Sequence, residues 1–244
     1  MTFRQNHEPK SFNDLIFHDP GVEQVLREYA NGQRTKHLIL HGPKGSGKSC
    51  AAQMILKERL PNNFPDMTTA SINGRTDRKR KNWKRLWNDW CFQNSSRGYT
   101  HIDEVDRFSE ALLDQLDEFL EHDRIGTIIM TTNHLENLDE WFVDRCATVE
   151  VLRPTASDMI DRAHAILQVE GYNYTRQQVG SMLNGFNGSL RKLVEALETY
   201  ILRNPPSAFS PTSVAQPSIP SAVLTVGTLQ LAKPQKLTVG GKPV

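Results

Sequence analysis

The sequence predicts an α/β fold with a parallel sheet, followed by a small domain made only of helices. Short β-prone runs alternate with amphipathic helical patterns up to about residue 152, and this alternation is typical of parallel sheets. After Arg153-Pro154 the β-prone runs stop, and the later periodic segments have helical spacing. We therefore expect an α/β domain at residues 1–153, a helical lid-like domain at 154–203 and a tail at 204–244.

The expected strands of the first domain are short and largely apolar. They are residues 38–40, 68–72, 99–103, 127–132 and 147–152. Helical spacing separates them, most clearly at residues 108–122, where an apolar stripe recurs every three or four positions. This order of elements predicts strands joined by crossover helices.

The helical domain and the tail differ sharply in composition. Residues 157–170, 175–183 and 189–202 carry apolar positions that would close a small bundle. From residue 204 onward, prolines lie among serines, threonines and glycines, so we expect a flexible tail. Leu-Thr-Val-Gly occurs there twice, at 224–227 and 237–240. The repeat is either chance or a pair of extended peptides that bind a protein partner.

The bulk composition excludes several classes of protein. The chain has 244 residues and a net charge of +1, so a nucleic-acid partner would have to meet a local patch. Its three widely spaced cysteines suit a reducing compartment better than a disulfide framework or a zinc site. The start has no apolar run typical of a secretion signal, and no segment is long enough to cross a membrane. We expect a soluble protein without membrane contact, located in the cytoplasm (at the nucleoid) or, in a eukaryote, in the nucleus.

The segment 41–49, His-Gly-Pro-Lys-Gly-Ser-Gly-Lys-Ser, predicts a phosphate-binding loop. It fills the pattern G-x-x-x-x-G-K-[ST] between an apolar run and a helical segment, as this loop requires. Lys48 is expected to reach the β- and γ-phosphates of ATP, and the Ser49 hydroxyl to bind Mg²⁺. The nucleotide contacts would come from Gly42, Pro43, Lys44, Gly45, Ser46, Gly47, Lys48, Ser49 and Cys50.

A second acidic motif favours hydrolysis over simple binding. His101-Ile102-Asp103-Glu104 ends an expected strand. Asp103 would then help to hold Mg²⁺, and Glu104 would polarise the attacking water. The alternative is an ordinary pair of acids at a helix start.

With these motifs, residues 8–203 resemble the AAA+ ATPases, and among them the clamp-loader subunits of the replication factor C type. The resemblance implies a P-loop AAA+ sheet domain, a helical lid, ATP hydrolysis with Mg²⁺, and assembly with itself or with related AAA+ subunits. Thr131-Thr132-Asn133 is similar to the family's first sensor, and Gly188-Ser189-Leu190-Arg191 to its second. Asp144-Arg145-Cys146 is similar to the Ser-Arg-Cys box, whose arginine acts on a neighbouring subunit. The implied catalytic residues are Glu104, Asn133, Arg145 and Arg191.

The chain also departs from clamp-loader subunits. The Pro- and Ser-rich tail stands where the family has a C-terminal collar domain. Asp117-Glu118 replaces a basic pair in the helix after Glu104, and Asp144 replaces the serine of the Ser-Arg-Cys box. These differences leave an ATPase expected but do not require a sliding-clamp loader.

A basic segment indicates a polymer substrate. Its cations, with Asp77 as the one acid among them, are Arg75, Arg78, Lys79, Arg80, Lys81, Lys84 and Arg85. They precede tryptophans at helical spacing, so one interpretation is a helix with a buried stripe and a solvated face. The other is a nucleic-acid contact through the phosphate backbone.

These observations predict an ATPase that works in an oligomer and acts on DNA in replication, recombination or transposition. Two alternatives remain at this stage. One is a helicase-loader-like or protein-remodelling ATPase that does not contact DNA. The other is a scaffold in which bound ATP supports assembly alone.

Overall fold

A computed structural model describes residues 2–59, 70–74, 100–120 and 127–205. The chain divides into two compact units. Residues 8–154 form an α/β unit, and residues 2–7 join those from 155 onward in a helical unit. Within the described ranges, no helix is both long enough and apolar enough to cross a membrane.

The α/β unit is built on a parallel five-stranded sheet, as the sequence predicts. The strand order is β2-β3-β4-β1-β5. The strands are β1 (Leu38–His41), β2 (Ala70–Asn73), β3 (Thr100–Asp103), β4 (Ile128–Thr132) and β5 (Ala147–Glu150). Because all the strands run the same way, their carboxyl ends meet at one edge, where open parallel sheets bind ligands.

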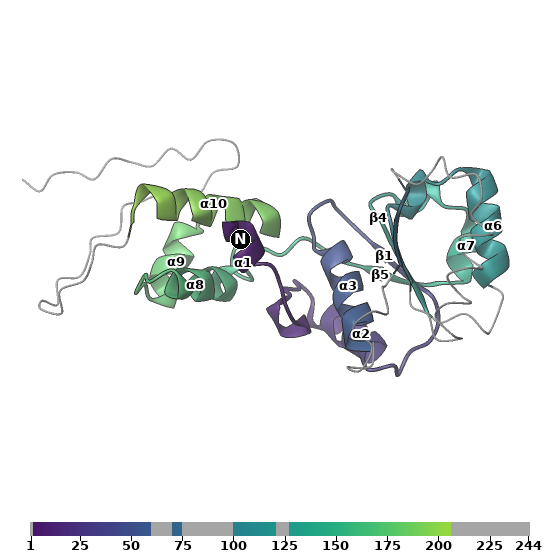
Figure 1. Ribbon diagram of the computed structural model, residues 1–244, viewed down its shortest axis with the longest axis horizontal. Helices are drawn as coiled ribbons and strands as arrows, with labels where there is room; N and C mark the ends of the chain where they lie inside the picture. Colours follow the sequence, from purple (N-terminus) through teal and green to yellow (C-terminus); the bar gives the residue numbers. More distant parts are fainter. Residues whose placement is uncertain (1, 60–69, 75–99, 121–126, 206–244) are drawn as a thin grey trace, which may run out of the picture. The chain divides into compact units, whose positions relative to one another are not determined.

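Helices cover both faces of this sheet (Figure 1). On one face lie α2 (Pro20–Ala30) and α3 (Lys48–Arg59), and on the other lie α6 (Glu110–Leu120) and α7 (Glu140–Asp144). Short 3₁₀ turns occur at Phe12–Asp14, Val105–Arg107 and Leu135–Asn137.

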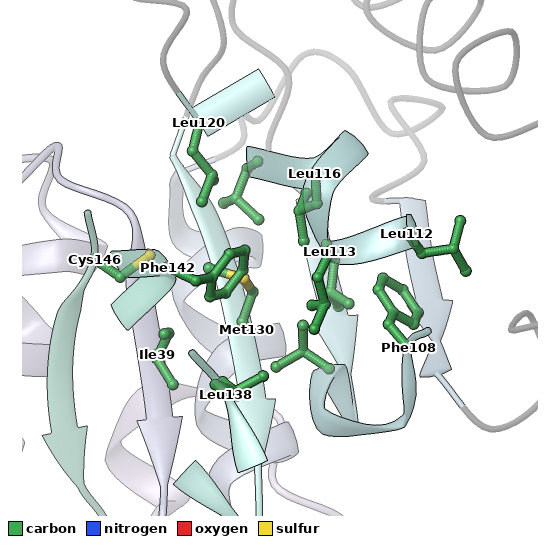
Figure 2. Close-up of a cluster of buried hydrophobic side chains, with 13 residues drawn as sticks. Ile39, Phe108, Leu112, Leu113, Leu116, Leu120, Met130, Leu138, Phe142 and Cys146 are labelled. Carbon is green, nitrogen blue, oxygen red and sulfur yellow. The ribbon is translucent and has the colours of Figure 1, made fainter. Parts of the chain in front are cut away.

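Alternation along β1 explains why both faces are covered. Leu38 and Leu40 belong to the core on the α2 and α3 face, whereas Ile39 belongs to the core on the α6 and α7 face. The latter core includes Leu113, Met130 and Phe142, among others (Figure 2). A strand that is apolar on both sides must be covered on both sides, which makes it a central strand.

The helical unit contains α1 (Phe3–Asn6), α8 (Ile160–Val169), α9 (Arg176–Met182) and α10 (Leu190–Arg203). Their apolar faces form one buried cluster, and Ser189 is the N-cap of α10, its side chain accepting a hydrogen bond from the Lys192 amide.

One boundary differs from our expectation. Residues 2–7, which we assigned to the first domain, join the helical unit. Phe3 packs against the helical core, and His7 Nε2 lies 2.7 Å from Glu170 Oε1. So short a segment has no periodicity from which this docking could be predicted.

Candidate nucleotide site

The phosphate-binding loop lies at the carboxyl edge of the sheet. Residues 42–47 connect β1 to α3, and Lys48, Ser49 and Cys50 form the first turn of α3. Gly42 has φ +133°, and a Cβ atom there would lie 2.5 Å from the carbonyl oxygen of Val151. Only glycine therefore fits where the loop passes β5. The start of the 12-residue helix α3 directs its unpaired N–H groups toward the space where phosphates would bind.

Lys48 connects the loop to the end of a neighbouring strand. Its Nζ donates hydrogen bonds to the carbonyl oxygens of Gly42 (2.8 Å) and Pro43 (2.9 Å) and to Asn133 Oδ1 (3.0 Å). The side chain is buried, and the residue is only 6% exposed. The expected phosphate-binding cation and the expected first sensor are therefore in direct contact.

Burial lowers the pKa of Lys48 from 10.5 to about 8. The Asp103 and Asp106 carboxylates oppose this change, whereas the Arg153 guanidinium adds to it. Lys48 still carries a positive charge at neutral pH. An anionic phosphate would add to the charges that favour the protonated lysine.

Asp103 and Ser49 form a set of oxygen donors suited to Mg²⁺. Ser49 Oγ donates a hydrogen bond to Asp103 Oδ1 at 2.7 Å, and Thr131 Oγ1 donates to the same oxygen. Asn73 Nδ2 donates to Asp103 Oδ2 at 3.3 Å. Carboxylate and hydroxyl oxygens are the ligands that Mg²⁺ prefers, so these two residues fit the metal. Asp103 is fixed in place by side chains from β2, α3 and β4.

Glu104 sits in a strained turn directly after β3. Its φ of +53° is the only positive value found for a non-glycine residue in the described part of the chain. The Glu104 amide donates to Thr131 Oγ1 at 3.3 Å. Gly74 makes room for this turn, because a Cβ atom there would lie 2.1 Å from the Glu104 carbonyl oxygen. The turn thus places the Glu104 backbone close to the ends of β2 and β4.

Two site residues were missed by sequence reasoning. Thr132 Oγ1 donates to Asp106 Oδ1 at 2.7 Å, and the Asp106 side chain is only 2% exposed. This bond ties the turn after β4, which carries Asn133, to the turn after β3. Arg153, just beyond β5, donates through Nη2 to the Lys44 carbonyl oxygen at 2.9 Å. The Asp-x-x-Asp spacing from Asp103 was a signal for Asp106, but nothing in the local sequence indicated Arg153.

The remaining predicted residues lie elsewhere. Arg145 follows α7, and its Nη1 lies 2.8 Å from Asp117 Oδ2 on α6. Arg191 lies in the first turn of α10, in the helical unit. The basic segment, Arg75, Arg78, Lys79, Arg80, Lys81, Lys84 and Arg85, is outside the described residues, as is nearly all of the tail. The roles of these residues remain predictions.

Comparison with known proteins agrees with this geometry. Residues 38–154 match the AAA family, described as ATPases associated with various cellular activities. Replication factor C subunit 4 of Caenorhabditis elegans is 22% identical over 211 residues, which cover 82% of this chain and 62% of that protein. The replication factor C large subunit of Pyrococcus abyssi is 23% identical over 202 residues, covering 81% of this chain and 41% of that protein.

A solved structure shares the fold. A variant of RuvB from Thermotoga maritima superimposes with a TM-score of 0.64 at 17% identity, over 79% of this chain and 64% of that one. The chain thus spans less than two thirds of the length of each of these three proteins. The phosphate loop, the acidic turn after β3 and these similarities lead to one conclusion: residues 38–154 are similar to the ATPase domain of the AAA family, and the chain resembles the subunits of replication factor C.

Proposed function

We propose that this protein binds and hydrolyses ATP with Mg²⁺ in an oligomer, and that it acts on DNA or on a protein complex bound to DNA. One observation carries the proposal. The bonds from Lys48 to Asn133 (3.0 Å) and from Ser49 to Asp103 (2.7 Å) join the loop, β3 and β4 in one site. A structural glycine-rich turn would not require these charged contacts.

The loop and α3 bind the triphosphate. Lys48 exchanges its contacts with loop carbonyls for phosphate oxygens, which its charge favours. Ser49 and Asp103 would hold Mg²⁺, which when bound would neutralise negative charge on the triphosphate. Arg153 supports the loop through its hydrogen bond to the Lys44 carbonyl oxygen.

Glu104 and Asn133 act on the attacking water. Glu104 accepts a proton from the water, and Asn133 holds the water in line with the γ-phosphate. Asp106 and Thr132 support this arrangement, because their hydrogen bond fixes the turn that carries Asn133. The residue that accepts the proton, Glu104, and the residue that orients the water, Asn133, therefore lie on two turns that are joined by a hydrogen bond.

Two arginines complete the charge balance. Arg145 of a neighbouring subunit and Arg191 of the same chain's lid offset the charge that develops on the γ-phosphoryl group. The resemblance of their motifs to the AAA+ family supports both assignments. An arginine supplied from outside makes hydrolysis depend on assembly.

DNA is the proposed polymer substrate. The similarity to replication factor C subunits supports a role in DNA replication or a related process, such as recombination or transposition. The basic segment that includes Arg78, Lys79, Arg80 and Lys81 would contact the phosphate backbone. The 204–244 tail would add a protein contact outside the ATPase body.

The test measures ATP turnover and particle mass in ATP, with and without DNA. Faster turnover with DNA, together with an ATP-dependent rise in mass, supports the proposal. Replacing Arg78, Lys79, Arg80 and Lys81 by glutamine should weaken DNA binding and flatten its salt dependence. An ATP turnover rate that does not change with DNA would indicate a protein-remodelling ATPase. Assembly without ATP turnover would indicate a scaffold.

A further inference from the structure

The turn Asp144-Arg145-Cys146 is fixed in place by contacts of each of its three residues. The Asp144 carbonyl oxygen accepts a hydrogen bond from Lys36 Nζ at 3.1 Å. Cys146 is buried in the core on the α6 and α7 face, and its amide donates to the Val143 carbonyl oxygen at 2.9 Å. Burial raises the pKa of the Cys146 thiol to about 12, so this anchor remains neutral.

The arginine side chain between these anchors is held by an acid from another helix. Arg145 Nη1 lies 2.8 Å from Asp117 Oδ2, with the two side chains 35% and 16% exposed. Asp117 lies on α6, which packs through Leu113 and Leu116 into the same core as Phe142 of α7 and Cys146 (Figure 2). Asp117 and Arg145 therefore belong to elements that pack into the same hydrophobic core.

A contribution to stability does not explain this contact well. Ion pairs between partly exposed side chains contribute little to folding, because solvent screens them and both side chains lose freedom. The contact has a larger effect on the orientation of the Arg145 side chain. An ion pair at 2.8 Å between two partly buried side chains restricts where the guanidinium can move, and this removes in advance part of the freedom that a long side chain would lose on binding.

We propose that Asp117 is the positioning residue for Arg145, holding its guanidinium in the orientation that reaches the γ-phosphate of the neighbouring subunit. The inference rests on the proposed function, in which Arg145 acts in trans. Asp117 itself touches neither ATP nor the water. Its substitution should therefore lower kcat at the interface and leave KM for ATP unchanged, since only a transition-state contact is lost.

The test uses assemblies of two inactive proteins. A donor carries Glu104→Gln and supplies only Arg145, whereas an acceptor carries Arg145→Ala and supplies only the ATP site. Mixed assemblies contain interfaces with both intact parts, so the parent mixture should recover turnover. Asp117→Asn is then placed in the donor alone or in the acceptor alone.

Asp117→Asn in the donor should lower kcat of the mixture by about tenfold, as expected for lost orientation. In the acceptor, which has no Arg145 to position, the same substitution should have no effect. General damage to the fold would lower turnover in both contexts and would overturn the proposal. Asp114→Asn, an exposed acid on the same helix, is the matched control in the donor and should leave turnover unchanged.

Two further results would contradict the proposal. Unchanged or faster turnover with Asp117→Asn in the donor would show that the carboxylate does not orient Arg145, or that it competes with the phosphate. No recovery in the parent mixture, with mixed assemblies present by mass, would overturn action in trans and with it this inference. The parent mixture thus separates failure of the proposed function from failure of the role of Asp117.

Discussion

The two units of this protein use polar side chains in opposite ways. In the α/β unit, Lys48 at the start of α3, Asp103 at the end of β3 and Asp106 in the following turn bond to side chains from other elements. In the helical unit, the hydroxyl groups of Tyr174 and Tyr200 meet at 2.6 Å inside the bundle, and Thr175 caps α9. The first unit concentrates charge where a ligand would bind, whereas polar groups in the second close helix ends and complete packing.

This difference predicts different results of mutation. Substitutions of Lys48, Asp103 and the other polar residues at the carboxyl edge of the sheet should change binding or turnover more than stability. Substitutions in the helical bundle should change stability and leave nucleotide affinity intact.

The largest expected effect is at Lys48. Lys48→Ala should raise the Kd for ATP by about a thousandfold, because charge-assisted bonds to the phosphates are lost. Binding of a fluorescent ATP analogue measures this change. Lys57→Ala removes the same charge near the other end of α3 and should stay within about twofold of wild type. An equal loss of ATP affinity in the two variants would show that ATP binding depends on the overall positive charge and not on the phosphate loop.

A smaller effect is expected at Cys146. Its pKa of about 12 keeps the thiol protonated at pH 8, where alkylation needs the thiolate. Iodoacetamide should therefore modify Cys146 in the folded protein at least about a hundredfold more slowly than in the unfolded protein. Peptide mapping by mass spectrometry measures each rate, with partly exposed Cys50 as the reactive comparison. Equal rates at the two cysteines would mean that the turn carrying Arg145 opens readily.

The smallest effect is at the helix cap in the other unit. Thr175 Oγ1 accepts a hydrogen bond from the Gln178 amide at 3.2 Å, so Thr175→Ala should lower the free energy of unfolding by about 1 kcal/mol. Thr199→Ala, inside α10 where the hydroxyl donates to the Glu195 carbonyl oxygen at 2.8 Å and caps no helix end, should change it by less than about 0.5 kcal/mol. Denaturant titration measures both, and ATP affinity should stay the same. A loss of ATP affinity in Thr175→Ala but not in Thr199→Ala would contradict the expectation that the helical unit affects stability alone.

The sequence predicted the parts of the fold that depend on local pattern. Apolar runs at 38–40 and 127–132 became central strands, and the stripe at 108–122 became α6. The phosphate loop was predictable because its glycines and lysine occur within nine consecutive positions. In these segments a few neighbouring residues determine the structure.

The rest of the site depends on strand register, which no local pattern reveals. Pairing of β2 with β3 sets Asn73 beside Asp103, and pairing of β1 with β4 sets His41 beside Thr132. Arg153 reaches the loop only because β5 pairs with β1. The left-handed turn at Glu104 also requires space left by Gly74, 30 positions earlier in the chain.

The most direct test of the account measures ATP binding and hydrolysis on the same protein with Glu104→Gln. Under conditions where the wild type is assembled and turns over ATP, the variant should bind ATP normally. It should release phosphate about a hundredfold more slowly or worse, because the general base is lost. Glu110→Gln, at the start of α6, should hydrolyse ATP at the wild-type rate. Phosphate release by Glu104→Gln at the wild-type rate would contradict the assignment of the catalytic site.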